Sequence, residues 1–299
     1  MRRTTFAVLV FSLLPAPLFA QPVPGRDLLR FPLGTMDRAV ALGSGLGDGL
    51  GNPATVALLD TGALHVGMAA LQTSSQQGVT VQLAAVAVRL PRQIVLTTSF
   101  ARAAVADLVR TETDPQSIGS EIPYSTQLIS VGVANRIAGP LSAGAALRYR
   151  RGELDLARSG EVGADVGLFA THLPLRDLSI GVSTFLWRPG KSLEQYTAIN
   201  MAADVRIAGT ATTRELRAGY SSSAIVRWAR EEFVFVQGRY GIWEGRGGIA
   251  RDLVHGAQPW RHRLGLTIHV APYSVGIARE ENGAELEPIY QFTLSARLR

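Results

Sequence analysis

The last residues of the chain alternate strictly between apolar and polar side chains. Tyr290, Phe292, Leu294, Ala296 and Leu298 are separated by Gln291, Thr293, Ser295 and Arg297. A two-residue period is the signature of a β-strand with one apolar and one polar face. Such a strand is typical of the end of an outer-membrane β-barrel, although these chains commonly finish on an aromatic residue and this one finishes on Leu298 and Arg299.

The first residues predict export from the cytoplasm. Two arginines, Arg2 and Arg3, precede an apolar stretch over residues 6–14, and the small residue Ala20 stands at the expected cleavage site. This order is that of a secretory signal peptide, so we expect residues 1–20 to be removed. A membrane anchor would need roughly 20 apolar residues, and Pro15 and Pro17 stop this stretch short.

Alternating segments recur from residue 64 to the end and predict an all-β transmembrane antiparallel barrel over residues 64–299. The expected strands begin near residues 64, 78, 93, 125, 141, 160, 177, 197, 214, 231, 243, 261, 272 and 288. About fourteen strands is an even number within the range of bacterial barrels. The Gly-rich segment near 243 is the weakest of them, so twelve or thirteen strands is the alternative. A soluble sandwich would also have many short strands, but it would need no export signal.

Composition excludes several classes of protein. A mean hydropathy of +0.14 with 46% hydrophobic residues is high for an exported chain without a helical span, and strands with one lipid-facing side explain it. Cysteine is absent, so no disulfide framework is expected. The net charge of +6 comes from arginines spread singly through the chain. Nucleic-acid binding would need a clustered basic stripe, so we expect no nucleic-acid partner.

Residues 21–63 form an N-terminal segment of a different kind. Between residues 36 and 61 the chain is rich in glycine and shows no two-residue alternation. A compact piece without strands, placed before the first strand of a barrel, is a candidate for a hatch inside the lumen.

The motif in this segment resembles that of the FadL-type outer-membrane transporters and the related PorV/PorQ group. The residues that carry the resemblance are Arg38, Ala39, Leu42, Gly43, Gly45, Asp48, Asn52, Pro53 and Ala54. The resemblance implies a fourteen-stranded barrel with a hatch in its lumen. It also implies passive transport or binding of hydrophobic small molecules such as long-chain fatty acids. This chain is shorter than a typical FadL, so we expect its external loops to be shorter as well.

Two alternatives remain for the function. A PorV/PorQ-like chain would be an accessory of type IX protein secretion, with secretion-machine proteins as partners. A plain structural barrel would have outer-membrane lipid alone as its partner. All three hypotheses place the chain in the outer membrane of a Gram-negative-type bacterium.

An enzyme is not expected. The five histidines, His65, His172, His255, His262 and His269, lack metal-ligand spacing, and no Gly-x-Ser-x-Gly elbow occurs. We therefore predict no catalytic residues, no metal and no cofactor.

The polar faces of the strands carry charges of both signs. The candidate lumenal residues are Arg148, Arg150, Glu161, Asp165, Asp204, Arg206, Glu215, Arg217, Arg263 and Glu280. Mixed signs on neighbouring faces favour structural ion pairs over a substrate role, because a selective pore would cluster one sign. Residues 79–88 are apolar on both faces, so this part of the inner wall is expected to contact either the hatch or a hydrophobic ligand.

Overall fold

The structure is a computed structural model, and it describes residues 23–25, 28, 36–43, 45–59, 64–73, 78–106, 108–110, 121–188, 198–210, 214–225, 229–253, 260–281 and 288–298. The expected signal peptide lies outside the described residues, as do the last two residues of the expected hatch.

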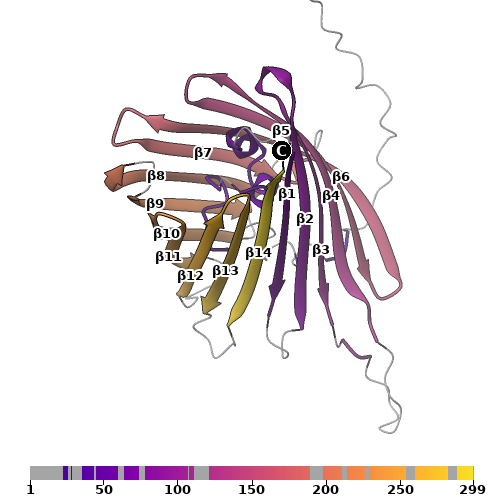
Figure 1. Ribbon diagram of the computed structural model, residues 1–299. Helices are drawn as coiled ribbons and strands as arrows, with labels where there is room; N and C mark the ends of the chain where they lie inside the picture. The colour runs from indigo at the N-terminus through magenta and orange to yellow at the C-terminus, as the bar shows by residue number, and fades with distance from the viewer. Residues whose placement is uncertain are drawn as a thin grey trace, which may run out of the picture.

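Fourteen antiparallel strands form a closed barrel in which each strand pairs with its neighbours in sequence and β1 pairs with β14 (Figure 1). The strands are β1 (Leu64–Gln72), β2 (Val79–Arg89), β3 (Val95–Val105), β4 (Tyr124–Ala138), β5 (Leu141–Leu154), β6 (Ala157–Leu173), β7 (Leu178–Phe185), β8 (Ala198–Thr210), β9 (Arg214–Ile225), β10 (Ala229–Tyr240), β11 (Trp243–Asp252), β12 (Arg261–Val270), β13 (Tyr273–Glu281) and β14 (Ile289–Leu298). The predicted fold and strand number are confirmed.

Every predicted strand start lies within three residues of the observed one. The Gly-rich segment near residue 243 is a full strand, β11, which pairs with β10 and β12. Its inward face carries Glu244 and Arg246 rather than apolar side chains, and this is why hydropathy alone gave it a weak signal.

The outer face of the barrel is an apolar belt. Outward side chains such as Leu147, Val275 and Phe292 are 63%, 55% and 57% exposed. The intervening residues face the interior and are buried, as with Arg148 on β5. Exposed apolar belts on this scale need a lipid solvent, so the barrel is of the outer-membrane type. Among the described residues, no helix is long and apolar enough to cross a membrane.

The two ends of the barrel differ in the length of their connections. At one end the strands are joined by short turns, such as residues 139–140, 241–242 and 271–272. The longest connections, residues 106–123 and 186–197, are at the other end. Outer-membrane barrels have short periplasmic turns and longer external loops, which makes the second end the external one.

Candidate functional site

The N-terminal segment, residues 36–59, folds without strands and lies inside the ring of strands (Figure 1). It contains two short 3-10 helices, η2 (Gly47–Leu50) and η3 (Pro53–Leu58). The second contacts the inner faces of β4, β5 and β6. At the end of the segment, the carbonyl oxygen of Leu59 accepts a hydrogen bond from Arg89 on β2.

The motif residues hold this segment in shape. The carboxylate of Asp48 accepts from the backbone N–H of Gly45 at 2.8 Å and from Arg38 Nη1 at 3.2 Å. A Cβ at position 43 or 45 would collide with Asp48, so both glycines are needed for the close approach. The spacing of the motif is therefore explained by the internal packing of one loop.

Asn52 joins the segment to the barrel wall. Its Oδ1 accepts from the N–H of Ala54 at 3.0 Å and caps η3, whose first residue is Pro53. Its Nδ2 donates to the carbonyl oxygens of Ala41 at 2.8 Å and of Leu168 on β6 at 3.3 Å. One fully buried side chain thus fixes a helix start, an internal loop and a contact with the wall.

Glycines on the inner wall make room for the segment. A Cβ at Gly144 would collide with Pro53, one at Gly167 with Asn52, and one at Gly265 with Asp37. These positions lie on β5, β6 and β12. Their role was not predicted from the sequence, because glycine gives no signal in an alternating pattern.

We predict that Gly144→Val displaces the N-terminal segment and leaves the barrel closed. The new side chain takes the space of Pro53, whereas the strand keeps its hydrogen bonds to β4 and β6. Limited proteolysis of the folded protein should cut within residues 36–59 at least tenfold faster, if the lost packing is about 1.4 kcal/mol or more. Gly245→Val is the matched control, since a Cβ there meets nothing within 4 Å; equal cleavage of both variants would contradict the prediction.

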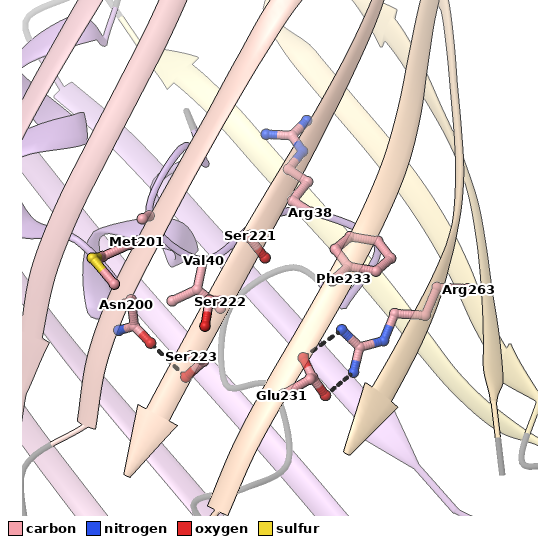
Figure 2. A pocket seen from close by; sticks show the side chains of 11 residues that line it. Arg38, Val40, Asn200, Met201, Ser221, Ser222, Ser223, Glu231, Phe233 and Arg263 are labelled. Atoms are coloured by element: carbon pink, nitrogen blue, oxygen red, sulfur yellow. Dashed lines mark hydrogen bonds and ion pairs between the residues drawn. The ribbon is translucent and has the colours of Figure 1, made fainter. Parts of the chain in front are cut away.

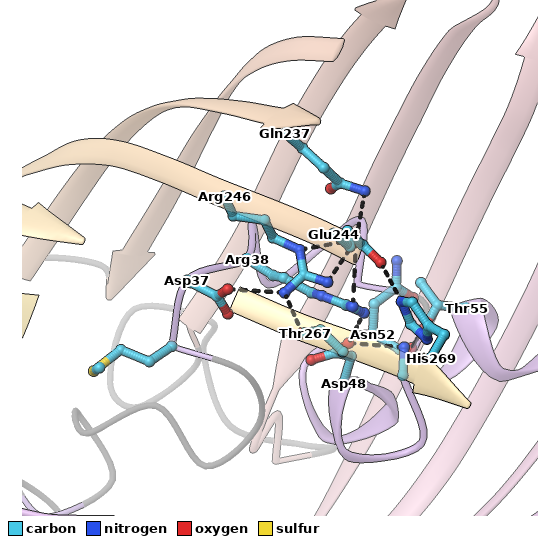
Figure 3. Close-up of polar contacts among 12 residues, drawn as sticks. Asp37, Arg38, Asp48, Asn52, Thr55, Gln237, Glu244, Arg246, Thr267 and His269 are labelled. Atoms are coloured by element: carbon cyan, nitrogen blue, oxygen red, sulfur yellow. Dashed lines mark hydrogen bonds and ion pairs between the residues drawn. The ribbon is translucent and has the colours of Figure 1, made fainter. Parts of the chain in front are cut away.

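Charged and polar wall residues bind the segment at several points (Figure 3). Arg246 Nη1 on β11 contacts Asp37 Oδ2 at 2.8 Å, and both side chains are 2% exposed. Arg38 lies between Asp48 and Glu244. Contacts outside this cluster include those of Gln291 Oε1 with the Met36 N–H at 2.6 Å, Ser183 Oγ with the Gly51 carbonyl at 2.6 Å, Arg148 with the Leu50 carbonyl, and Arg89 with the Ala57 and Leu59 carbonyls.

The ten candidate lumenal residues all lie in ion pairs with inner-wall partners. The pairs are Arg148 with Asp165, Arg150 with Glu161 at 2.6 Å, Arg217 with Asp204 at 2.5 Å, Arg217 with Glu215 at 3.8 Å, Arg206 with Glu215 at 3.9 Å, and Arg263 with Glu280. Two of these arginines also reach the N-terminal chain: Arg148 at Leu50, and Arg150 at the carbonyl oxygens of Val23 and Pro24.

Several members of this network were not predicted from the sequence. Glu244, Arg246 and Gln291 hold the N-terminal segment, and Glu231 bridges Arg261 and Arg263. Their positions on inward faces follow from alternation, so a uniform search of every strand could have found them. Asp37 gave no such signal, because the segment that carries it has no period.

Asp177 is another missed residue, in the turn between β6 and β7. It accepts hydrogen bonds from His172 at 2.6 Å and from Arg217 at 3.0 Å, and it contacts Arg206. Burial alone would raise the pKa of its carboxyl group, but these donors outweigh burial and lower the pKa below its ordinary value. The turn is therefore linked by charge to β8 and β9.

An apolar cluster fills the lumen beside β1, β2, β3 and β4. It contains Val79, Val81, Leu83 and Leu128 of the wall, with Leu28, Met36 and Leu50 of the N-terminal chain packed against them. The apolar inner face expected over residues 79–88 is therefore present, and in this structure it contacts N-terminal residues. Buried ion pairs line the inner wall from β5 to β13, with Phe233 and Phe235 buried among them, so the lumen has an apolar side and a mainly charged side.

A small cavity remains between the segment and the wall (Figure 2). It is lined by Arg38 and Val40 of the segment, by Asn200, Ser222 and Phe233 of β8–β10, and by the Glu231–Arg263 pair, among others. Within the described residues no group of three His, Cys, Asp or Glu side chains could hold a metal ion.

Comparison with solved structures finds the same fold in several channels. The Ralstonia pickettii toluene transporter TbuX superposes with a TM-score of 0.63 at 10% identity, covering 91% of this chain and all of TbuX. The CymD monoaromatic hydrocarbon channel gives 0.59 at 12% identity, covering 93% and 98%. A Pseudomonas aeruginosa FadL homologue gives 0.53 at 12%, covering 89% and 98%. No family model and no curated protein matches the sequence.

Proposed function

We propose that this protein is a passive outer-membrane channel for hydrophobic small molecules, with the N-terminal segment as its hatch. The observation that carries the proposal is the apolar side of the lumen. There Met36 and Leu50 of the hatch pack against a wall of valine and leucine side chains. When the hatch moves, this wall offers a hydrophobic molecule an apolar surface in place of those two side chains.

The substrate class we favour is a compact hydrocarbon. The solved neighbours TbuX and CymD are described as a toluene transporter and a monoaromatic hydrocarbon channel. A long-chain fatty acid is the second candidate substrate, from the resemblance of the hatch motif. A PorV/PorQ-like secretion accessory or a structural barrel would transport neither.

Uptake by proteoliposomes tests the proposal. Vesicles with the full chain should accumulate radiolabelled toluene faster than empty vesicles. Val81→Asn should lower the rate of toluene uptake about tenfold, because an unpaired amide on the apolar wall costs about 1–3 kcal/mol when the ligand desolvates it. Thr80→Asn, on the outward face of the same strand, is the matched control. No uptake of toluene or fatty acid by the wild type would reject transport.

A further inference from the structure

Two outward-facing arginines near the external end of the barrel have no partner among the residues that the structure describes. Arg102 on β3 and Arg151 on β5 are both exposed. Within the described residues, neither guanidinium group forms an ion pair or a hydrogen bond. Other outward arginines toward this end differ. Arg158 pairs with Glu153, Arg230 with Glu232 at 2.8 Å, and Arg279 with Glu281 at 2.7 Å.

The strand register brings the two arginines to one row. Arg102 is opposite Gln127 of β4, and Gln127 is opposite Arg151. Gln82 of β2 extends the row on the other side of Arg102. Neighbouring strands are about 4.8 Å apart, so the two arginine Cα atoms are separated by about 10 Å and their side chains can converge on one group.

The row marks the upper limit of the apolar belt. The next outward row toward the periplasm is Phe100, Ile129 and Tyr149, which are 42%, 48% and 47% exposed. Charged side chains within the hydrocarbon would be costly, and here they begin where the apolar residues end. The arginines therefore lie at the depth of the lipid headgroups in the external leaflet.

Tyr149 adds a hydroxyl group to this row. Gly160 of β6 pairs with Arg151, and a Cβ there would collide with the Tyr149 hydroxyl. The Tyr149 ring therefore lies over Gly160, at the level of Arg151, and the space that it fills leaves no room for a side chain at position 160. Two guanidinium groups, two amides and a phenol make a surface of donors without a carboxylate.

We propose that this row, formed by Gln82, Arg102, Gln127, Tyr149 and Arg151, binds the phosphate groups of an anionic lipid in the external leaflet. Arginine matches phosphate in charge and in the geometry of its paired donors. The neighbouring apolar row provides the surface for the acyl chains of the same molecule. The bound lipid is a fixed part of the outer surface, separate from the lumen and from any transported molecule.

The test measures lipid retained by the full chain in native mass spectrometry, with lipid A as the probe. Wild type should retain lipid A, and the Arg102→Gln/Arg151→Gln variant should bind it about 25-fold more weakly, since each interfacial arginine contributes about fivefold. Arg230→Gln/Arg279→Gln removes the same charge at the same end from arginines that are already paired, on strands away from the row. It should bind as the wild type does.

A second comparison needs no variant. The wild type should lose phosphate-free lipid A as readily as the Arg102→Gln/Arg151→Gln variant loses lipid A. Excess inorganic phosphate should not displace lipid A from the wild type. Equal retention of the two lipids, or equal binding by the two double variants, would overturn the proposal. Heat-modifiable migration verifies that each variant is a closed barrel.

Discussion

Deletion of residues 36–61 should convert the closed barrel into an open, water-filled pore. In the intact chain the segment lies against both sides of the lumen, through η3 on β4–β6 and through Asp37 on β11. Without it, the charged inner faces of β8–β13 would face an empty space that water can enter. The ring of strand pairs does not depend on the segment, so the barrel should persist.

Single-channel recording in planar bilayers measures this effect. The intact chain should give no resolvable ionic conductance, whereas the deletion variant should give discrete conductance steps. Heat-modifiable migration of both proteins is the control for a closed barrel. A folded deletion variant that conducts no ions would mean that the lumen is blocked by something other than the N-terminal segment.

Replacement of Asp165 by leucine should be the most destabilising single substitution in the wall. The side chains of Arg148 and Asp165 are both 0% exposed and form an ion pair across β5 and β6. Removing one partner leaves a buried, uncompensated charge and costs about 3–5 kcal/mol. Arg148 also binds the Leu50 carbonyl, so the loss should loosen the hatch.

A double variant separates the charge effect from packing. Arg148→Met/Asp165→Leu removes both charges, and it should regain most of the free energy of unfolding that Asp165→Leu loses. Urea unfolding in lipid vesicles, followed by tryptophan fluorescence, gives both values. If the double variant is as unstable as Asp165→Leu alone, the Asp165 carboxylate does not stabilise the barrel by compensating the charge of Arg148.

The strands could be predicted because a barrel wall obeys one simple rule. A residue either faces lipid or faces the lumen, so alternation gives the strand positions and the face of each residue, as for Arg148 and Tyr149. Which charges meet could not be predicted in this way. The Arg148–Asp165 pair depends on the register between β5 and β6, and this register follows from turn geometry and packing.

The candidate site was less accessible from the sequence. The motif residues Arg38, Asp48 and Asn52 could be recognised as a group, but their contacts are mostly within the segment or with the backbone. The fit between segment and wall depends on glycines such as Gly144 and Gly265, which are visible only once the two surfaces are brought together. Asp37 could not be found because its partner Arg246 is 209 residues away in the chain.

If hydrophobic molecules cross only when the hatch moves, a reversible cross-link between the hatch and the wall should stop them. A Cβ added at Gly265 would lie 2.8 Å from the Cβ of Asp37. A small shift therefore gives the Cβ–Cβ separation of about 3.5–4.5 Å that a disulfide needs. The chain has no other cysteine, so the Asp37→Cys/Gly265→Cys variant can form only this bond within the molecule.

Uptake of radiolabelled toluene by vesicles with this variant is measured before and after reduction. The oxidised protein should transport at the rate of empty vesicles, and reduction should restore uptake in the same preparation. Equal toluene uptake by the oxidised and reduced protein would contradict the account, because the hydrocarbon would then pass while the hatch is held against the wall.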